Sequence, residues 1–260
     1  MTLPRPEAPS LEAKEHRSSE PESPALQKPR YRFGQAIPTP RRTPVTFGYL
    51  TILCLGYVLV YKVVPISVAR DFLLSISTTV PAMESRPLVA LAGSTLVLTP
   101  PLWSVSSLIT LAGGIGWCMG RVERTYGASI CVAVFVAGHV GGTLITTGVK
   151  IAGVRAGFYD ASVLRTFDFG PSYGTIAIMA VMILFLPQLL RPVWLLTGVA
   201  YLLYLATWHG PLPDFTTIGH LSAVAIGLAC AVALHRSRPE ARNKNKSGTA
   251  KAPERQNTQT

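Results

Sequence analysis

Long uncharged runs, separated by short charged or proline-containing stretches, dominate the middle of the chain. Because a helix rises 1.5 Å per residue and the hydrocarbon core of a bilayer is about 30 Å thick, about 20 apolar residues span it. The pattern therefore predicts an all-α membrane protein with six spans. They are expected at residues 43–61, 102–120, 125–149, 169–190, 192–208 and 216–235.

The stretch between Arg86 and Arg121 holds 34 uncharged residues, too many for one crossing. Pro100-Pro101 divides it, because proline disfavours helical geometry in the residue before it and favours a new helix start. We therefore expect an interfacial or re-entrant segment at Pro87–Thr99, ahead of the second span.

The composition agrees with this organisation. Of the 260 residues, 48% are hydrophobic and 14% are charged, whereas soluble proteins carry about 25% charged residues. Residues 1–45 and 236–260 hold 22 of the 37 charges. We expect a six-span membrane domain at 43–236 between disordered basic cytoplasmic tails at 1–42 and 237–260. This excludes a soluble enzyme, a disulfide scaffold and a nucleic-acid binder.

The net charge of +11 acts mainly as an orientation signal. With an even number of spans both tails share one side, which holds 18 basic residues against 6 on the other. Since cytoplasmic segments carry the excess of Lys and Arg, we expect a multi-pass protein of the cell membrane with both termini cytoplasmic. Its basic tails would meet anionic membrane lipids. Ser67-Val68-Ala69 suits a signal peptidase, but the preamble before the first span is long, so we expect no cleavage.

Polar residues inside apolar spans are costly and point to function. Ser172 opens the fourth expected span, just after Gly170-Pro171. It lies near unpaired backbone N–H groups at the positive end of the helix dipole, where a developing oxyanion would be stabilised. The alternative is an ordinary helix start that Asp168 or Ser172 caps.

His220 is the second candidate. Gly219, Ala223 and Gly227 are spaced by four residues and form a small-residue stripe for close helix packing. His220 shares a face with Gly227, so it should point toward a neighbouring helix. Both spans run inward, and Ser172 and His220 should lie at matching depth. A serine beside a histidine is the minimum for nucleophilic acyl transfer.

Three further features have less specific interpretations. His139, halfway along the third span, either hydrogen-bonds a neighbouring helix, which we favour, or belongs to a polar site. Glu123 and Arg124, at the inner end of the second span, are expected to pair locally, as a structural ion pair or an interface anchor. The four cysteines lie in apolar runs without metal-ligand spacing, as packing residues do.

Three short motifs resemble those of rhomboid proteins in their order and spacing. They are Gly113-Gly114 with Glu123 and Gly127, Gly170-Pro171-Ser172, and Gly219-His220 with Gly227. The resemblance covers about residues 45–236 and implies a divergent member with a six-transmembrane-helix rhomboid-like bundle. It also implies an intramembrane serine protease with Ser172 as nucleophile and His220 as general base. It implies no cofactor or metal, and the implied partners are transmembrane helices of substrate or client proteins.

The chain departs from the family's pattern around this pair. Rhomboid proteases place a His and an Asn, four apart, on the second span to help hold the oxyanion, and the corresponding residues are Ser107 and Leu111. Loss of an oxyanion donor costs about 10²–10³ in turnover, and Ser106 or Ser107 is a candidate substitute. Three more positions differ: Tyr173 replaces a glycine, Ile176 replaces the aromatic residue that stacks on the histidine, and Ala223 replaces a glycine.

Two functions follow from these residues. The first is an intramembrane serine protease that cleaves transmembrane substrates near the outer membrane face, with residues 209–217 and the fifth span as a gate. The second is a catalytically inactive rhomboid-like protein that binds or escorts transmembrane helices. A transporter or channel is disfavoured, because the spans contain little buried charge.

Overall fold

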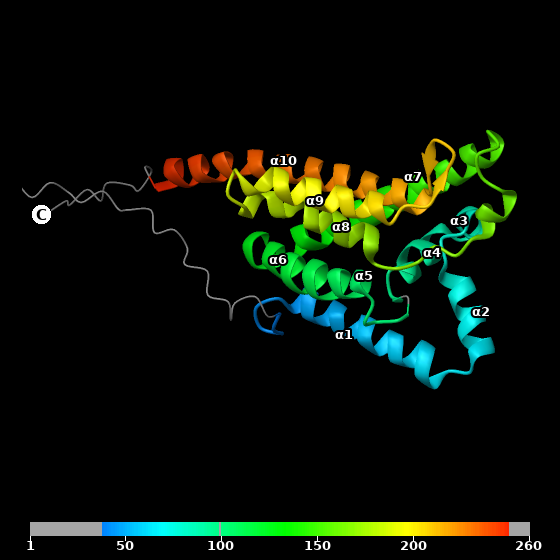
Figure 1. Ribbon diagram of the computed structural model, residues 1–260. Helices are drawn as coiled ribbons and strands as arrows, with labels where there is room; N and C mark the ends of the chain where they lie inside the picture. The colour runs from blue at the N-terminus through cyan, green and yellow to red at the C-terminus, as the bar shows by residue number, and fades with distance from the viewer. Residues whose placement is uncertain (1–37, 99, 250–260) are drawn as a thin grey trace, which may run out of the picture. The chain divides into compact units, whose positions relative to one another are not determined.

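The computed structural model describes residues 38–98 and 100–249, and these are almost entirely helical (Figure 1). The first half contains α1 (Pro44–Val58) with its continuation η2 (Leu59–Val63), α2 (Ile66–Ile76), α3 (Val80–Ser85), α4 (Pro87–Ser94), and the continuous helix of α5 (Val105–Leu108), η3 (Ile109–Met119) and α6 (Gly120–Tyr126). The second half contains α7 (Ala128–Arg155), η4 (Ala161–Arg165), α8 (Ser172–Val181) with η5 (Met182–Phe185), α9 (Leu190–Tyr204), the hairpin of β1 (Trp208–His209) and β2 (Leu212–Pro213), and α10 (Phe215–Thr249).

Four helices are long and apolar enough to cross a membrane, as a multi-pass membrane protein requires. They are Pro44–Val63, Val105–Tyr126, Ala128–Arg155 and Phe215–Ser237. Two shorter apolar helices, Ser172–Phe185 and Leu190–Tyr204, lie where the fourth and fifth spans were expected. The expected N-terminal tail lies outside the described residues except for its last few. α10 continues to Thr249, into the stretch expected to form the C-terminal tail.

The fourth apolar helix is shorter than expected at both ends. Its expected start, Phe169, belongs instead to a connecting segment without helical structure. Its end comes at Phe185, because Leu186 is extended (ψ 146°) and precedes Pro187, and proline disfavours the helical conformation in the residue before it. The helix therefore has 14 residues, Ser172–Phe185.

The second long helix extends past its expected end at Gly120 to Tyr126, and this extension includes the charged residue Glu123. Glu123 is 4% exposed, and its carboxylate accepts hydrogen bonds from the Val45 N–H at 2.9 Å, the Thr46 N–H at 2.8 Å and the Thr46 hydroxyl at 2.7 Å. These donors lie in the first turn of α1, where backbone N–H groups lack helical partners. Among the described residues Glu123 forms no ion pair with Arg124. It anchors α6 to the first turn of α1, which is the second of the two expected roles.

α8 packs against α7, α10 and η3, and its contacts with them depend on glycine. Ala177 lies between Gly138 of α7 and Gly227 of α10, and a Cβ on either glycine would clash with it. Thr175 packs in the same way against Gly114 of η3. Figure 1 shows α9 and α10 running along one another beside α8. The small-residue stripe expected on the last span therefore brings α10 onto α8.

The packing of α8 against α10 predicts that Gly227→Ala destabilises the protein. The added Cβ would lie 2.8 Å from the Ala177 Cα. Because a backbone atom cannot rotate away as a side chain can, the two helices must separate. We expect this to lower the free energy of unfolding by about 1–3 kcal/mol. Gly148→Ala on α7 is the matched control, because nothing lies within 4 Å of its added Cβ, and it should be neutral or stabilising by up to about 1 kcal/mol. Thermal unfolding in detergent measures both. Equal losses in the two variants would contradict this packing.

Candidate active site

Ser172 is the first residue of α8, and a glycine and a hydrogen bond fix the backbone before it. Gly170 has φ 129°, a backbone conformation that would be strained in any residue with a side chain. Its N–H donates to the carbonyl oxygen of Ser94 at the end of α4, at 2.7 Å. The N-cap residue of α8 is Pro171, and no side chain caps the helix. The alternative expectation, in which Asp168 or Ser172 serves as the cap, is therefore wrong.

The backbone of Asp168 attaches the same segment to the stretch between α2 and α3. The Asp168 N–H donates to the Ser77 hydroxyl at 2.9 Å. Its carbonyl oxygen accepts from the Thr78 N–H at 2.9 Å and from the Thr78 hydroxyl at 2.7 Å. The approach to Ser172 is thus held from two sides, by α4 and by the α2–α3 connection.

His220 lies in the second turn of α10, whose first turn is fixed by an aspartate. The Asp214 carboxylate accepts from the Thr217 N–H at 3.1 Å and from the Thr217 hydroxyl at 2.7 Å. This is the usual arrangement of a helix N-cap. The same carboxylate accepts from the Thr207 N–H at 3.0 Å, which ties the end of α9 to the start of α10.

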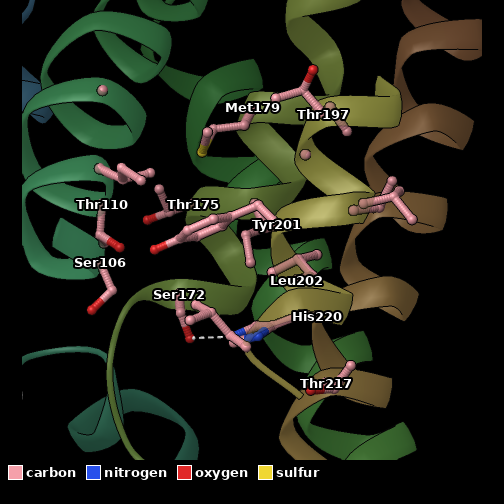
Figure 2. Close-up of a pocket in the computed structure, with 18 of the residues that line it drawn as sticks. Ser106, Thr110, Ser172, Thr175, Met179, Thr197, Tyr201, Leu202, Thr217 and His220 are labelled. Atoms are coloured by element: carbon pink, nitrogen blue, oxygen red, sulfur yellow. Dashed lines mark hydrogen bonds between the residues drawn. The ribbon is translucent and has the colours of Figure 1, made fainter. Parts of the chain in front are cut away.

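The structure brings the two predicted residues together. The Ser172 Oγ lies 3.0 Å from the His220 Nε2, and both residues are half-buried (Figure 2). The serine O–H donates in this pair when the imidazole proton sits on Nδ1, so that Nε2 is free to accept. This is the geometry through which a histidine takes the proton of a nucleophilic serine.

Ser172 and His220 lie on the wall of a cavity of about 710 Å³ between η3, α8, α9 and α10. Its lining is mainly apolar and includes Trp117, Trp194 and Leu202. A large apolar cavity with a few converging polar groups is the usual form of a binding site.

Three hydroxyl side chains from η3, α5 and α8 lie on the same cavity as the pair: Ser106, Thr110 and Thr175 (Figure 2). The Thr175 hydroxyl is buried and has no hydrogen-bond partner among the described residues. The positions taken from the family's pattern behave differently. Ser107 donates to the Pro101 carbonyl oxygen at 3.2 Å, and Leu111 packs against the hydrophobic core.

The helix that carries these residues is α-helical at Val105–Leu108 and π-helical at Ile109–Met119. Ser106 and Thr110, each one position before Ser107 and Leu111, line the cavity in their place.

A buried ion pair that the sequence pattern does not predict includes Asp168, four residues before Ser172. The Lys150 Nζ is 3.7 Å from the Asp168 Oδ2, and the lysine side chain is fully buried. The ammonium also lies 4.2 Å from the centroid of the Phe215 ring, a cation–π contact. Lys150 was expected to lie just beyond the third span. The available signal was that Lys150 directly follows the third expected span and Asp168 directly precedes the fourth, so each charge borders an apolar run.

His139 does not line the cavity. Its Nε2 lies 3.0 Å from the Leu91 carbonyl oxygen and 3.2 Å from the Ser94 hydroxyl, so it joins α7 to α4. The backbone carbonyl oxygen of the same Ser94 accepts the hydrogen bond from the Gly170 N–H. Through Ser94, His139 therefore supports the segment before Ser172. These contacts agree with the packing interpretation.

The hairpin between α9 and α10 is attached to the connection between α7 and α8. The Tyr159 hydroxyl donates to the Pro213 carbonyl oxygen at 2.6 Å, and its ring meets His209 edge-on at 5.3 Å. Burial, and then the nearby Asp214 carboxylate, raise the pKa of the Tyr159 hydroxyl. The hydroxyl therefore stays protonated and keeps donating this hydrogen bond.

A family model described as rhomboid-like protein matches residues 39–241. The matched stretch covers most of the chain and includes Ser172, His220 and every element that lines the cavity. The comparisons with curated proteins and with solved structures found no match.

The buried ion pair predicts a non-additive double-mutant cycle. Lys150→Met leaves the Asp168 carboxylate unpaired, and Asp168→Asn leaves the ammonium unpaired, so each single change should cost about 3–5 kcal/mol. The double variant leaves no buried charge and should be more stable than either single variant. Denaturant unfolding of the four proteins measures the coupling. A double variant whose loss equals the sum of the single losses would contradict the pairing.

Proposed function

The chain belongs to the rhomboid-like family, and we propose that it is a divergent intramembrane serine protease that cleaves transmembrane substrates near the outer membrane face. The observation that supports this most is the 3.0 Å hydrogen bond between Ser172 and His220 on the wall of a largely apolar cavity. An apolar cavity of this kind fits a hydrophobic substrate segment, and the pair supplies a nucleophile and its base.

The reaction would proceed through an acyl-enzyme. His220 Nε2 takes the proton of Ser172 as the serine oxygen attacks the scissile carbonyl carbon. The imidazolium then protonates the leaving amine nitrogen as the C–N bond breaks, and the serine is left as an ester. A water molecule, deprotonated by the same Nε2, attacks that ester. The ester bond breaks, the proton returns to the serine oxygen, and the carboxylic acid product leaves.

The start of α8 supplies donors for the oxyanion. The first N–H groups of a helix have no partner within it, and those of Ser172 and Tyr173 are at this position. Preorganised donors of this kind stabilise the charge that develops on the carbonyl oxygen. We propose that the hydroxyls of Ser106 and Thr110, which lie on the same cavity, take the place of the missing His and Asn.

The short fourth helix would set the depth of the reaction. Its ten α-helical and four 3₁₀ residues rise about 23 Å in total, against a hydrocarbon core of about 30 Å. In the proposed six-span topology with both termini cytoplasmic, this helix ends at the inner face. Ser172 then lies about 7 Å below the outer face.

Substrate would enter between η3 and α9. No residue of α9 is fully buried. Its first turns are attached to α8 through Trp194, whose Nε1–H donates to the Met179 carbonyl oxygen at 2.9 Å. The later residues Tyr201 and Leu202 line the cavity. Outward movement of this end would admit a transmembrane helix from the lipid.

The alternative is a catalytically inactive protein that binds or escorts transmembrane helices through the same cavity. The observation that favours it is the absence of the His and Asn side chains at Ser107 and Leu111. The two functions differ in whether Ser172 is reactive, while both require the cavity.

Reactivity of Ser172 predicts covalent labelling by a fluorophosphonate. The purified protein should form a phosphonyl-serine, and Ser172→Ala and His220→Ala should both abolish it, because one lacks the nucleophile and the other the base. Ser222→Ala is the control: it lies on α10 two residues after His220, and its hydroxyl donates to the Ile218 carbonyl oxygen. Unlabelled wild-type protein that is folded and still retains transmembrane peptides would establish the inactive alternative.

A further inference from the structure

We propose that Tyr173 is the positioning residue of His220, and that its ring holds the imidazole in line with Ser172. The inference rests on the proposed function, because it assigns a role within the same pair. The three residues come from the start of α8 and the second turn of α10.

The Tyr173 ring contacts the histidine directly. The ring centroids lie 5.1 Å apart, with an interplanar angle of 62°, within the range of edge-to-face aromatic pairs. Tyr173 is 3% exposed. A Cβ on Gly219 would lie 2.7 Å from the tyrosine ring, and one on Gly142 of α7 would lie 3.0 Å from the tyrosine Cβ. The ring thus occupies a slot that two glycines open, beside the backbone that carries His220.

The hydroxyl group of Tyr173 is held in place by two hydrogen bonds. The hydroxyl donates to the Asp168 Oδ2 at 3.2 Å and accepts from the Thr146 hydroxyl at 3.2 Å. Asp168 in turn pairs with the buried Lys150. The tyrosine is therefore anchored to α7 and to the segment before α8, and it cannot swing away from the histidine without breaking these bonds.

The imidazole has few other restraints. Within residues 38–98 and 100–249, the one hydrogen bond of its side chain is the bond to Ser172. His220 also lines the cavity, so part of its surroundings is open space. A ring free to rotate about its side-chain bonds would lose the alignment of Nε2 with the serine, and misplacement of about 1 Å in a catalytic geometry costs up to about 10²-fold in rate. Tyr173 supplies the restraint.

The first arm of the test is the rate of fluorophosphonate labelling in three variants. Tyr173→Leu removes the aromatic contact and should slow labelling by about tenfold or more. Tyr173→Phe keeps the ring and loses the hydroxyl bonds, so its rate should fall less than about threefold while its unfolding temperature drops. Tyr173→Leu combined with Ile176→Phe places a ring one turn after Ser172, on the cavity that His220 lines, and should recover rate without recovering stability. A residue with a structural role alone would change rate and stability together.

The second arm measures the contact without any reaction. In protein labelled with ¹⁵N,¹³C-histidine, the His220 signals, assigned by their loss in His220→Gln, should shift in Tyr173→Leu because the ring current is removed. The signals of His209, which contacts Tyr159, should stay in place. Tyr173→Met gives a second replacement should the leucine variant fail to fold.

The two arms separate the possible failures. Unlabelled wild-type protein with a shifted His220 signal would refute the proposed function and leave the Tyr173–His220 contact established. A folded Tyr173→Leu or Tyr173→Met variant that labels at the wild-type rate, or whose His220 signals do not move, would overturn the positioning role.

Discussion

Ala177 of α8 lies between Gly138 of α7 and Gly227 of α10, and a side chain on either glycine would occupy the space that it fills. The site depends on this close approach. Ser172 begins α8 and His220 lies in the second turn of α10, so the separation of the two helices sets the 3.0 Å distance between their side chains. Because small-residue contacts bring helix backbones close where lipid gives no hydrophobic driving force, the pair depends on glycines one to two turns away.

The same close packing explains why the polar side chains of Asp168, Thr146 and Lys150 lie together in the interior, next to Tyr173. Closely packed α7, α8 and α10 leave a slot for one aromatic ring, and Tyr173 fills it next to His220. Its hydroxyl then needs partners in a buried setting, and Asp168 and Thr146 provide them. A carboxylate buried there needs a counter-charge, which Lys150 supplies.

Much of this arrangement can be predicted from the sequence, because apolar run lengths and small-residue spacing are local signals. The long helix at Pro44–Val63 follows its uncharged run closely, and the helix at Ala128–Arg155 covers most of the third expected span and continues past it. The meeting of Ser172 and His220 follows from two helices that start on the same side, each with its polar residue near the start. The family assignment from three short motifs is confirmed by the match to residues 39–241.

The remaining features of the site depend on three-dimensional packing, which the order of residues along the chain does not specify. Ser106 and Thr110, and not Ser107 and Leu111, line the cavity, and which face of a helix meets a cavity depends on how its neighbours pack. Lys150 pairs with Asp168 because a turn of the chain after α7 brings them together. The sequence pattern marks Tyr173 only as a residue that replaces a glycine. In the structure its ring lies against His220, whereas the family's aromatic position is Ile176.

The central claim is that the Ser172–His220 pair cleaves peptide bonds inside the membrane. The most direct measurement reconstitutes the protein in liposomes with a pool of synthetic single-span peptides that vary in the outer half of the span, and identifies the products by mass spectrometry. New termini are expected in that outer half with wild-type protein and none with Ser172→Ala. The same products from both proteins, or intact peptides from a wild-type protein that binds them, would contradict it.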